Sequence, residues 1–93
     1  LKAVLVVHNE TATGVTNDIA GLREAMDAAK HPALLLVDGV SSIGSLEFQQ
    51  DAWGVDVAIT GSQKGFMMPA GLGMVSLSPR ALEGIETAGF ARH

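Results

Sequence analysis

Lys64 is the residue of this chain with the clearest potential for covalent chemistry. It lies in the loop 61–65, Gly-Ser-Gln-Lys-Gly, directly after the predicted strand 55–60. The apolar run 66–69 follows it, and Asp56 is the only other ionisable residue within ten positions. An ammonium group in apolar surroundings is costly unless its pKa falls or it condenses with a carbonyl, and either change produces a nucleophile. The alternative is a solvated surface lysine.

Asp38 is the second candidate, because it follows the aliphatic run 33–37 without a break. A carboxylate held in a partly dry site pairs with a cation. A protonated pyridine nitrogen is such a cation, and keeping it protonated makes the ring an electron sink. The alternative is an aspartate that closes a turn or caps a helix. The residues alone leave both interpretations open.

Three polar clusters, 8–14, 38–42 and 61–65, each follow a predicted strand. Ligands of an open parallel sheet bind outside the carboxyl ends of its strands, so we expect the clusters at one rim. Thr11 and Gln63 are either turn residues or hydrogen-bond donors to a ligand, with Gln63 beside a phosphate.

Three further residues of these clusters keep an open role. Ser62 has the same two alternatives as its neighbour Gln63. His8 is weak evidence of a site, because a structural histidine is the commoner case. Glu10 is either a loop acid or an active-site group. We assign no catalytic role to His8 or Glu10.

The elements that position these residues follow from hydrophobic periodicity. Runs 2–7 and 33–37 are continuous aliphatic stretches, which predicts strands buried on both faces. Between them, apolar residues recur at helical spacing from position 19, after a capping residue at 16–18, until His31-Pro32 ends the helix. The unit is therefore βαβ.

The second half of the chain continues the same pattern. We expect a short helical turn over 48–53, whose Phe48 and Trp53 cover the sheet, and strands over 55–60 and 74–77. Ser78-Pro79 is a typical helix start, and Ala81, Leu82 and Ile85 are expected to face inward. The predicted fold class is α/β, with a mostly parallel open sheet.

Composition excludes several function classes. Six basic residues oppose ten acidic ones, for a net charge of −4 with no basic stripe, which argues against a nucleic-acid partner. The chain has no cysteine, which excludes zinc–thiolate sites and agrees with a cytoplasmic location. The longest apolar run is about half a membrane span, so no membrane partner is expected. A start on Leu1 and an apolar run looks like a segment of a longer protein.

Three motifs give the chain a family resemblance: HNETATGV at 8–15, LLLVDGVSSIGSLEF at 34–48 and GSQKGFMMPAGLG at 61–73. With these motifs the chain resembles the class V, fold-type I aminotransferases that depend on pyridoxal 5′-phosphate. Within this class, the motifs are most similar to those of serine–glyoxylate aminotransferases, with alanine–glyoxylate aminotransferases as near relatives. The resemblance implies that 1–93 is a fragment from the central part of the large cofactor-binding domain, without the upstream phosphate loop and the downstream small domain, of a homodimer.

The resemblance also implies a role for each matching residue. Lys64 would form the Schiff base with pyridoxal 5′-phosphate and carry the proton between the amino-acid and keto-acid carbons. Asp38 would bind the pyridine nitrogen, and Val40 would pack on one face of the ring. Gln63 would lie at the cofactor phosphate, and Thr11 would donate a hydrogen bond near the phenolic oxygen.

The implied reaction is amino transfer from serine, or alanine, to glyoxylate, which yields glycine and hydroxypyruvate, or pyruvate. The 93-residue piece alone is expected to be inactive. One alternative is another class V enzyme such as a cysteine desulfurase-like lyase, although such enzymes tend to carry histidine where this chain has Gln63. The other is a non-catalytic βαβ binding module. Arg23, Arg80 and Arg92 are not expected at the rim, so none is proposed to grip the substrate carboxylate.

Overall fold

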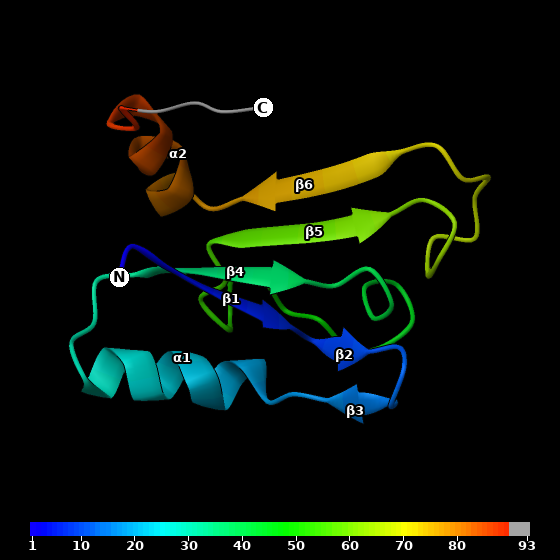
Figure 1. Ribbon diagram of the computed structural model, residues 1–93, viewed down its shortest axis with the longest axis horizontal. Helices are drawn as coiled ribbons and strands as arrows, with labels where there is room; N and C mark the ends of the chain where they lie inside the picture. Colours follow the sequence, from blue (N-terminus) through cyan, green and yellow to red (C-terminus); the bar gives the residue numbers. More distant parts are fainter. Residues whose placement is uncertain (90–93) are drawn as a thin grey trace.

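The computed structural model describes residues 1–89, which form a four-stranded sheet, a small hairpin and two helices (Figure 1). The elements are β1 (Ala3–Val7), β2 (Asn9–Glu10), β3 (Val15–Thr16), α1 (Ile19–Ala28), β4 (Leu34–Asp38), β5 (Val57–Gly61), β6 (Gly73–Leu77) and α2 (Pro79–Glu86). Neither described helix is long and apolar enough to cross a membrane.

The sheet has the order β1-β4-β5-β6 and is mostly parallel, as predicted. β1 pairs with β4 from Ala3↔Leu34 to Val7↔Asp38, and β4 continues in parallel with β5, where Asp38 is level with Ile59. β6 returns antiparallel to β5. The carboxyl ends of β1, β4 and β5 therefore lie at one edge of the sheet, the right-hand edge in Figure 1.

Both helices begin at the residues whose side chains cap them. The Asp18 carboxylate accepts a hydrogen bond from the Gly21 backbone N–H (2.9 Å), and the Ser78 hydroxyl accepts one from the Ala81 N–H (3.1 Å). Such bonds satisfy backbone donors that have no partner within the helix. The capping residue of α1 is therefore Asp18, within the predicted range 16–18.

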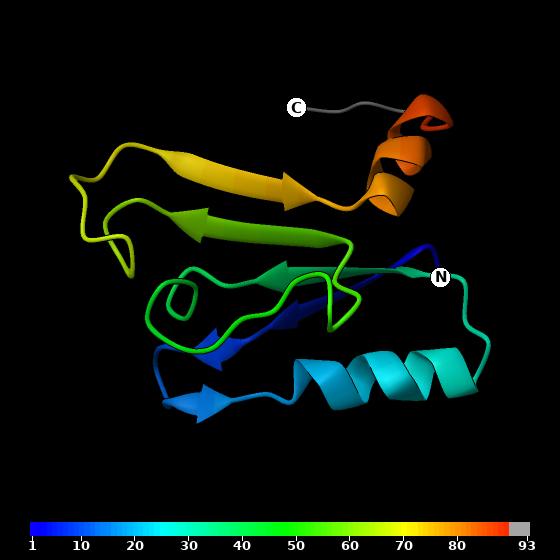
Figure 2. The same cartoon turned by 180° about the vertical axis from the view of Figure 1, so that it is seen from behind.

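The hydrophobic core lies between α1 and one face of the sheet. Its buried residues are Ile19, Met26, Ala33, Leu35, Val37, Val55 and Ala58. Phe48 and Trp53 pack against this core, which confirms their predicted covering role. Figure 2 shows the segment between β4 and β5, which carries both rings, crossing in front of the sheet. The helical turn predicted over 48–53 is only partly present. Residues 50–54 form turns, in which the Trp53 N–H donates to the Gln49 carbonyl (2.9 Å).

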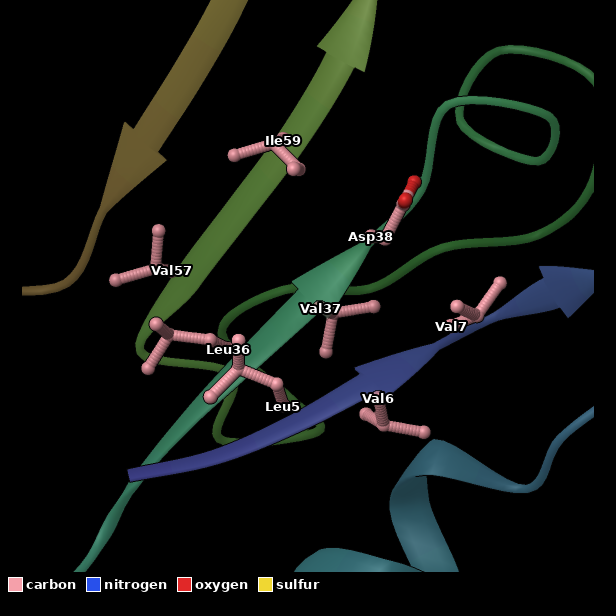
Figure 3. Close-up of a pocket in the computed structure, with 8 residues that line it drawn as sticks. All are labelled: Leu5, Val6, Val7, Leu36, Val37, Asp38, Val57 and Ile59. Atoms are coloured by element: carbon pink, nitrogen blue, oxygen red, sulfur yellow. The ribbon is translucent and has the colours of Figure 1, made fainter. Parts of the chain in front are cut away.

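The opposite face of the sheet is open, so the prediction of strands buried on both faces is wrong for the described residues. Leu5 in β1 is 76% exposed, and Leu34 and Leu36 in β4 are only half-buried. Leu5, Leu36, Val57 and Ile59 are among the side chains lining a shallow cavity of about 300 Å³ on this face (Figure 3). Continuous aliphatic strands indicate that both faces suit burial, but no described element lies over this one.

Two local predictions also differ from the structure. The expected loop at 8–16 contains the short antiparallel hairpin β2–β3, with Asn9↔Thr16 and Glu10↔Val15 paired. In α2 only Ala81 is buried, whereas Leu82 and Ile85 are exposed. The apolar spacing of α2 correctly indicates a helix, and that helix lies at the end of the sheet beside β6.

Candidate functional site

The rim at the carboxyl ends of β1, β4 and β5 brings together three of the predicted site residues. Thr11, Asp38 and Val40 line one cavity of about 240 Å³. The other lining residues are Val7, Asn9, Glu10 and Ser41. The rim cavity therefore combines two carboxylates, two hydroxyl groups, an amide and two valine side chains, a mixture of polar and apolar groups that suits a polar aromatic ring.

Asp38 is held at the end of β4 by its own turn. Its Oδ1 accepts the backbone N–H of Val40 (2.9 Å), and its carbonyl oxygen accepts the N–H of His8 (2.9 Å). The turn interpretation of Asp38 is therefore correct as far as Oδ1 is concerned. It is compatible with the ligand interpretation, because the same half-buried carboxylate lines the rim cavity.

Thr11 sits in the turn of the β2–β3 hairpin, and Glu10 shapes that turn. Glu10 Oε1 accepts the N–H of Ala12 (2.9 Å), and the Glu10 carbonyl accepts the N–H of Gly14 (2.7 Å). Gly14 has a φ of 72°, a conformation that glycine adopts without strain. One carboxylate oxygen of Glu10 therefore stabilises the turn. The sequence did not indicate this role, because it left Glu10 open as a loop acid or an active-site group.

A serine–asparagine contact ties this hairpin to the loop after β4. Ser41 Oγ donates to the Asn9 carbonyl oxygen (2.6 Å) and lies 3.2 Å from Asn9 Oδ1. Asn9 Nδ2 in turn donates to Thr16 Oγ1 (2.8 Å) across the hairpin. The turn that carries Thr11 and the loop that carries Val40 are thus connected by hydrogen bonds.

Lys64 lies at the same edge of the sheet, after β5, but neither it nor Gln63 lines the rim cavity. Both side chains are exposed. The apolar neighbours that suggested desolvation are exposed too, with Met67 at 90%. The argument that apolar neighbours desolvate Lys64 is therefore wrong for the described residues, because adjacency in sequence does not place those side chains around the amine.

Ser62 is a structural residue. Its side chain is fully buried, and Oγ donates to the Pro69 carbonyl oxygen (2.6 Å) while accepting the Leu72 N–H (3.3 Å). The Ser62 backbone closes the same loop, since its N–H donates to Leu72 O and its carbonyl accepts Met68 N–H. With its hydroxyl engaged in this way, Ser62 is not available as a phosphate donor.

Two glycines fix the lysine loop against the loop that follows Asp38. A Cβ built on Gly44, whose φ is 86°, would come within 2.9 Å of the Gly65 carbonyl carbon. A Cβ built on Gly65 would overlap the Ile43 carbonyl oxygen and the Gly44 backbone. The two backbones are in direct contact, so the absence of side chains sets how closely Lys64 approaches the rim.

We expect Gly65→Ala to destabilise the protein by about 1–3 kcal/mol, the usual cost of overpacking, because only backbone atoms surround the added methyl group. Thermal melting measures the change. Gly73→Ala is the matched control, since a Cβ there meets no atom within 4 Å. Equal melting temperatures for the two variants would contradict the close backbone contact.

Asp56, which no sequence motif singled out, is buried at the other end of β5 and carries an ionic cluster. Asp56 Oδ2 accepts the Leu35 N–H (2.8 Å), and Oδ1 accepts the Ser78 hydroxyl (3.1 Å). Arg23 and Arg80 approach its carboxylate at 3.8 and 3.9 Å. Neither arginine lines the rim cavity, as predicted, and Arg92 lies outside the described residues.

The amino-acid sequence is similar to those of known proteins. The model of aminotransferase class-V matches residues 1–91. L-aspartate–glyoxylate aminotransferase of Paracoccus denitrificans is 65% identical over 92 residues, which cover 99% of this chain and 23% of that protein. Serine–glyoxylate aminotransferase of Hyphomicrobium methylovorum is 64% identical over 83 residues, covering 89% of this chain and 20% of that protein.

The fold agrees with solved structures. Alanine–glyoxylate aminotransferase from Nostoc superimposes with a TM-score of 0.84 at 37% identity, over 92% of this chain and 22% of that one. The chain thus spans about a fifth of the length of these relatives. The match over residues 1–91, together with these identities, shows that the chain belongs to the class-V aminotransferase family.

Proposed function

We propose that this chain contributes the lysine-bearing part of a pyridoxal 5′-phosphate site in an aminotransferase that transfers an amino group to glyoxylate. The observation that carries the proposal is the rim cavity, where Thr11, Asp38 and Val40 meet beside the loop of Lys64. Relatives named as serine–glyoxylate and aspartate–glyoxylate aminotransferases support glyoxylate as the acceptor. We propose serine as the donor, with alanine as the second choice.

The residues at the rim fit the cofactor of this family. A half-buried carboxylate suits a protonated pyridine nitrogen, a hydroxyl suits a phenolic oxygen, and a valine side chain suits the face of a ring. Asp38, Thr11 and Val40 are therefore proposed to hold the ring. Gln63 is proposed to lie at the cofactor phosphate, on the loop that β5 delivers.

When bound, pyridoxal phosphate supplies the aldehyde for covalent attachment and the ring that takes up electrons from the substrate carbon. Lys64 would anchor the cofactor through its Nζ, and its amine would take the α-proton of the amino donor as a general base and deliver a proton to the α-carbon of the amino acid formed from the keto acid. Asp38 keeps the ring nitrogen protonated, which requires its negative charge near that atom.

Several properties of the whole protein remain predictions. The partners are proposed to be a small amino acid and a keto acid, with a second copy of the chain as subunit partner. The assignment of 1–93 to a fragment of the large domain and a cytoplasmic location also remain predictions.

The proposal is tested in a full-length chimera, in which this sequence replaces the matching segment of the Paracoccus denitrificans relative. We expect borohydride reduction of the cofactor-loaded chimera to place the pyridoxyl group on Lys64, identified by peptide mass. Lys64→Ala should abolish labelling of this segment, whereas Lys2→Ala, at an exposed lysine, should leave it intact. Labelling of Lys2 or Lys30 instead would overturn the proposal.

The donor is tested by supplying glyoxylate with serine, alanine or aspartate and measuring glycine. A second chimera with the Hyphomicrobium methylovorum relative separates the segment from its host. We expect serine to be used best in both. A preference for aspartate in both would contradict the serine assignment, and sulfide release from cysteine would favour a desulfurase-like lyase instead.

A further inference from the structure

The imidazole of His8 is packed inside the protein immediately behind the rim. His8 is only 4% exposed and lies between β1 and β2. Its ring centroid lies 5.5 Å from that of Phe48 and 5.6 Å from that of Trp53, and these two are 5.5 Å apart. The three rings form a closed triangle of tilted and edge-on contacts, here called the aromatic triad (His8, Phe48 and Trp53), a geometry that aromatic pairs favour.

The backbone of His8 connects the two parts of the rim that are proposed to hold the ring. Its N–H donates to the carbonyl oxygen of Asp38 (2.9 Å), and its carbonyl oxygen accepts the Asn17 N–H (2.8 Å). The next residue begins β2, which leads into the turn of Thr11. A displacement of His8 would therefore move Asp38 and Thr11 relative to each other.

The surroundings of the His8 ring favour a packing role over proton transfer. It does not line the rim cavity, and the described residues offer no hydrogen-bond partner to its buried Nδ1. Burial lowers the pKa of its imidazole from the ordinary value, which favours the uncharged ring. A neutral ring enclosed by Phe48 and Trp53 is suited to fixing a backbone position.

We propose that His8 is a positioning residue whose ring, anchored in the aromatic triad, sets the spacing between Asp38 and Thr11 that the cofactor ring requires. The inference rests on the proposed function. The segment between β4 and β5 then contributes to the site, because it carries Phe48 and Trp53, the two rings that enclose His8. Phe48 and Trp53 then support the site in addition to covering the sheet.

The test compares His8→Ala, His8→Phe and Met26→Ala in the full-length chimera. Met26 is a buried core residue of α1 and serves as a control for loss of packing alone. Titration with pyridoxal phosphate, followed by the visible absorption band, measures cofactor affinity. The pH at the midpoint of the change in this band measures the electrostatic environment of the cofactor ring. Thermal melting measures stability.

We expect His8→Ala to weaken cofactor binding about tenfold, the scale found when outer-shell partners of a site are removed. The pH midpoint of the band should shift in this variant and stay unchanged in Met26→Ala. His8→Phe, which preserves an aromatic ring in the triad, should restore both values. If His8→Ala lowers only the melting temperature, or if His8→Phe does not rescue it, the positioning role is wrong.

Borohydride labelling distinguishes this failure from failure of the proposed function. If Lys64 is labelled in every variant and affinity does not change in His8→Ala, only the inference about His8 is overturned. If Lys64 is not labelled even in the unsubstituted chimera, the proposed function itself is overturned.

Discussion

Asp38→Asn is expected to reduce the rate of amino transfer by roughly 10²–10³-fold, the usual cost of removing one group that stabilises charge in a reaction. The substitution is close to isosteric, and the asparagine side-chain oxygen can still accept the Val40 N–H that Asp38 Oδ1 accepts now. The turn should therefore keep its shape while the negative charge is lost. Steady-state rates with serine and glyoxylate in the full-length chimera measure the effect.

The control for Asp38 is Asp51→Asn. Asp51 is exposed and does not line the rim cavity, so its variant should keep the parent rate. The stability of Asp51→Asn should also stay within about 0.5 kcal/mol of the parent, as is usual for surface substitutions. If Asp38→Asn kept the full rate, Asp38 would be a turn residue only, which is the alternative that its bond to Val40 also supports.

The second large effect is expected on stability, from Asp56→Ala. Asp56 is 4% exposed, and its carboxylate accepts bonds from Leu35 and Ser78 while Arg23 and Arg80 approach it. Removing one partner of a buried ion pair typically costs about 3–5 kcal/mol. We expect the lower end of this range, because the Leu35 N–H loses its acceptor whereas Arg23 keeps Asp27 and Arg80 keeps the Pro32 and Ala33 carbonyls. Thermal melting of the full-length chimera should therefore show a lower transition.

Local hydrogen exchange refines the Asp56 test. The Leu35 amide donates to Asp56 Oδ2, so its exchange should accelerate strongly in Asp56→Ala. Asp51→Ala, at a nearby exposed carboxylate, should leave it unchanged. Asp56→Asn should fall between them, since it retains an acceptor but loses the charge. An Asp56→Ala protein as stable as the parent would show that the cluster contributes no net stability.

Local sequence patterns were sufficient for both helices and for the strands of the main sheet, but not for the β2–β3 hairpin. The spacing of Ile19, Leu22 and Met26 predicted α1, and Ser78-Pro79 predicted the start of α2. These signals succeed because they report interactions between residues a few positions apart. The same patterns failed for Leu82 and Ile85, because helical periodicity indicates an apolar face without specifying what covers it.

The sequence predicted the location of the rim, but only some of the contacts between its residues. The predicted parallel strands place the loops of Thr11, Asp38 and Lys64 at one edge of the sheet, and the structure has all three loops at that edge. The assignment of Ser62 to the Pro69–Leu72 loop and of Glu10 to its own turn required coordinates, because a serine or glutamate in a loop has the same appearance in sequence whichever partner it finds.

The amino-acid sequence by itself therefore determined the four strands of the main sheet and the two helices, the rim that carries the polar clusters, and the motifs of the class-V family. Only the tertiary structure decided which residues meet across that framework. The contact of Gly44 with Gly65, the burial of Asp56 between two arginines and the enclosure of His8 by Phe48 and Trp53 join residues about 20 to 45 positions apart. Such contacts depend on strand register and on the path of the segment between β4 and β5, and hydrophobic periodicity contains no information about either.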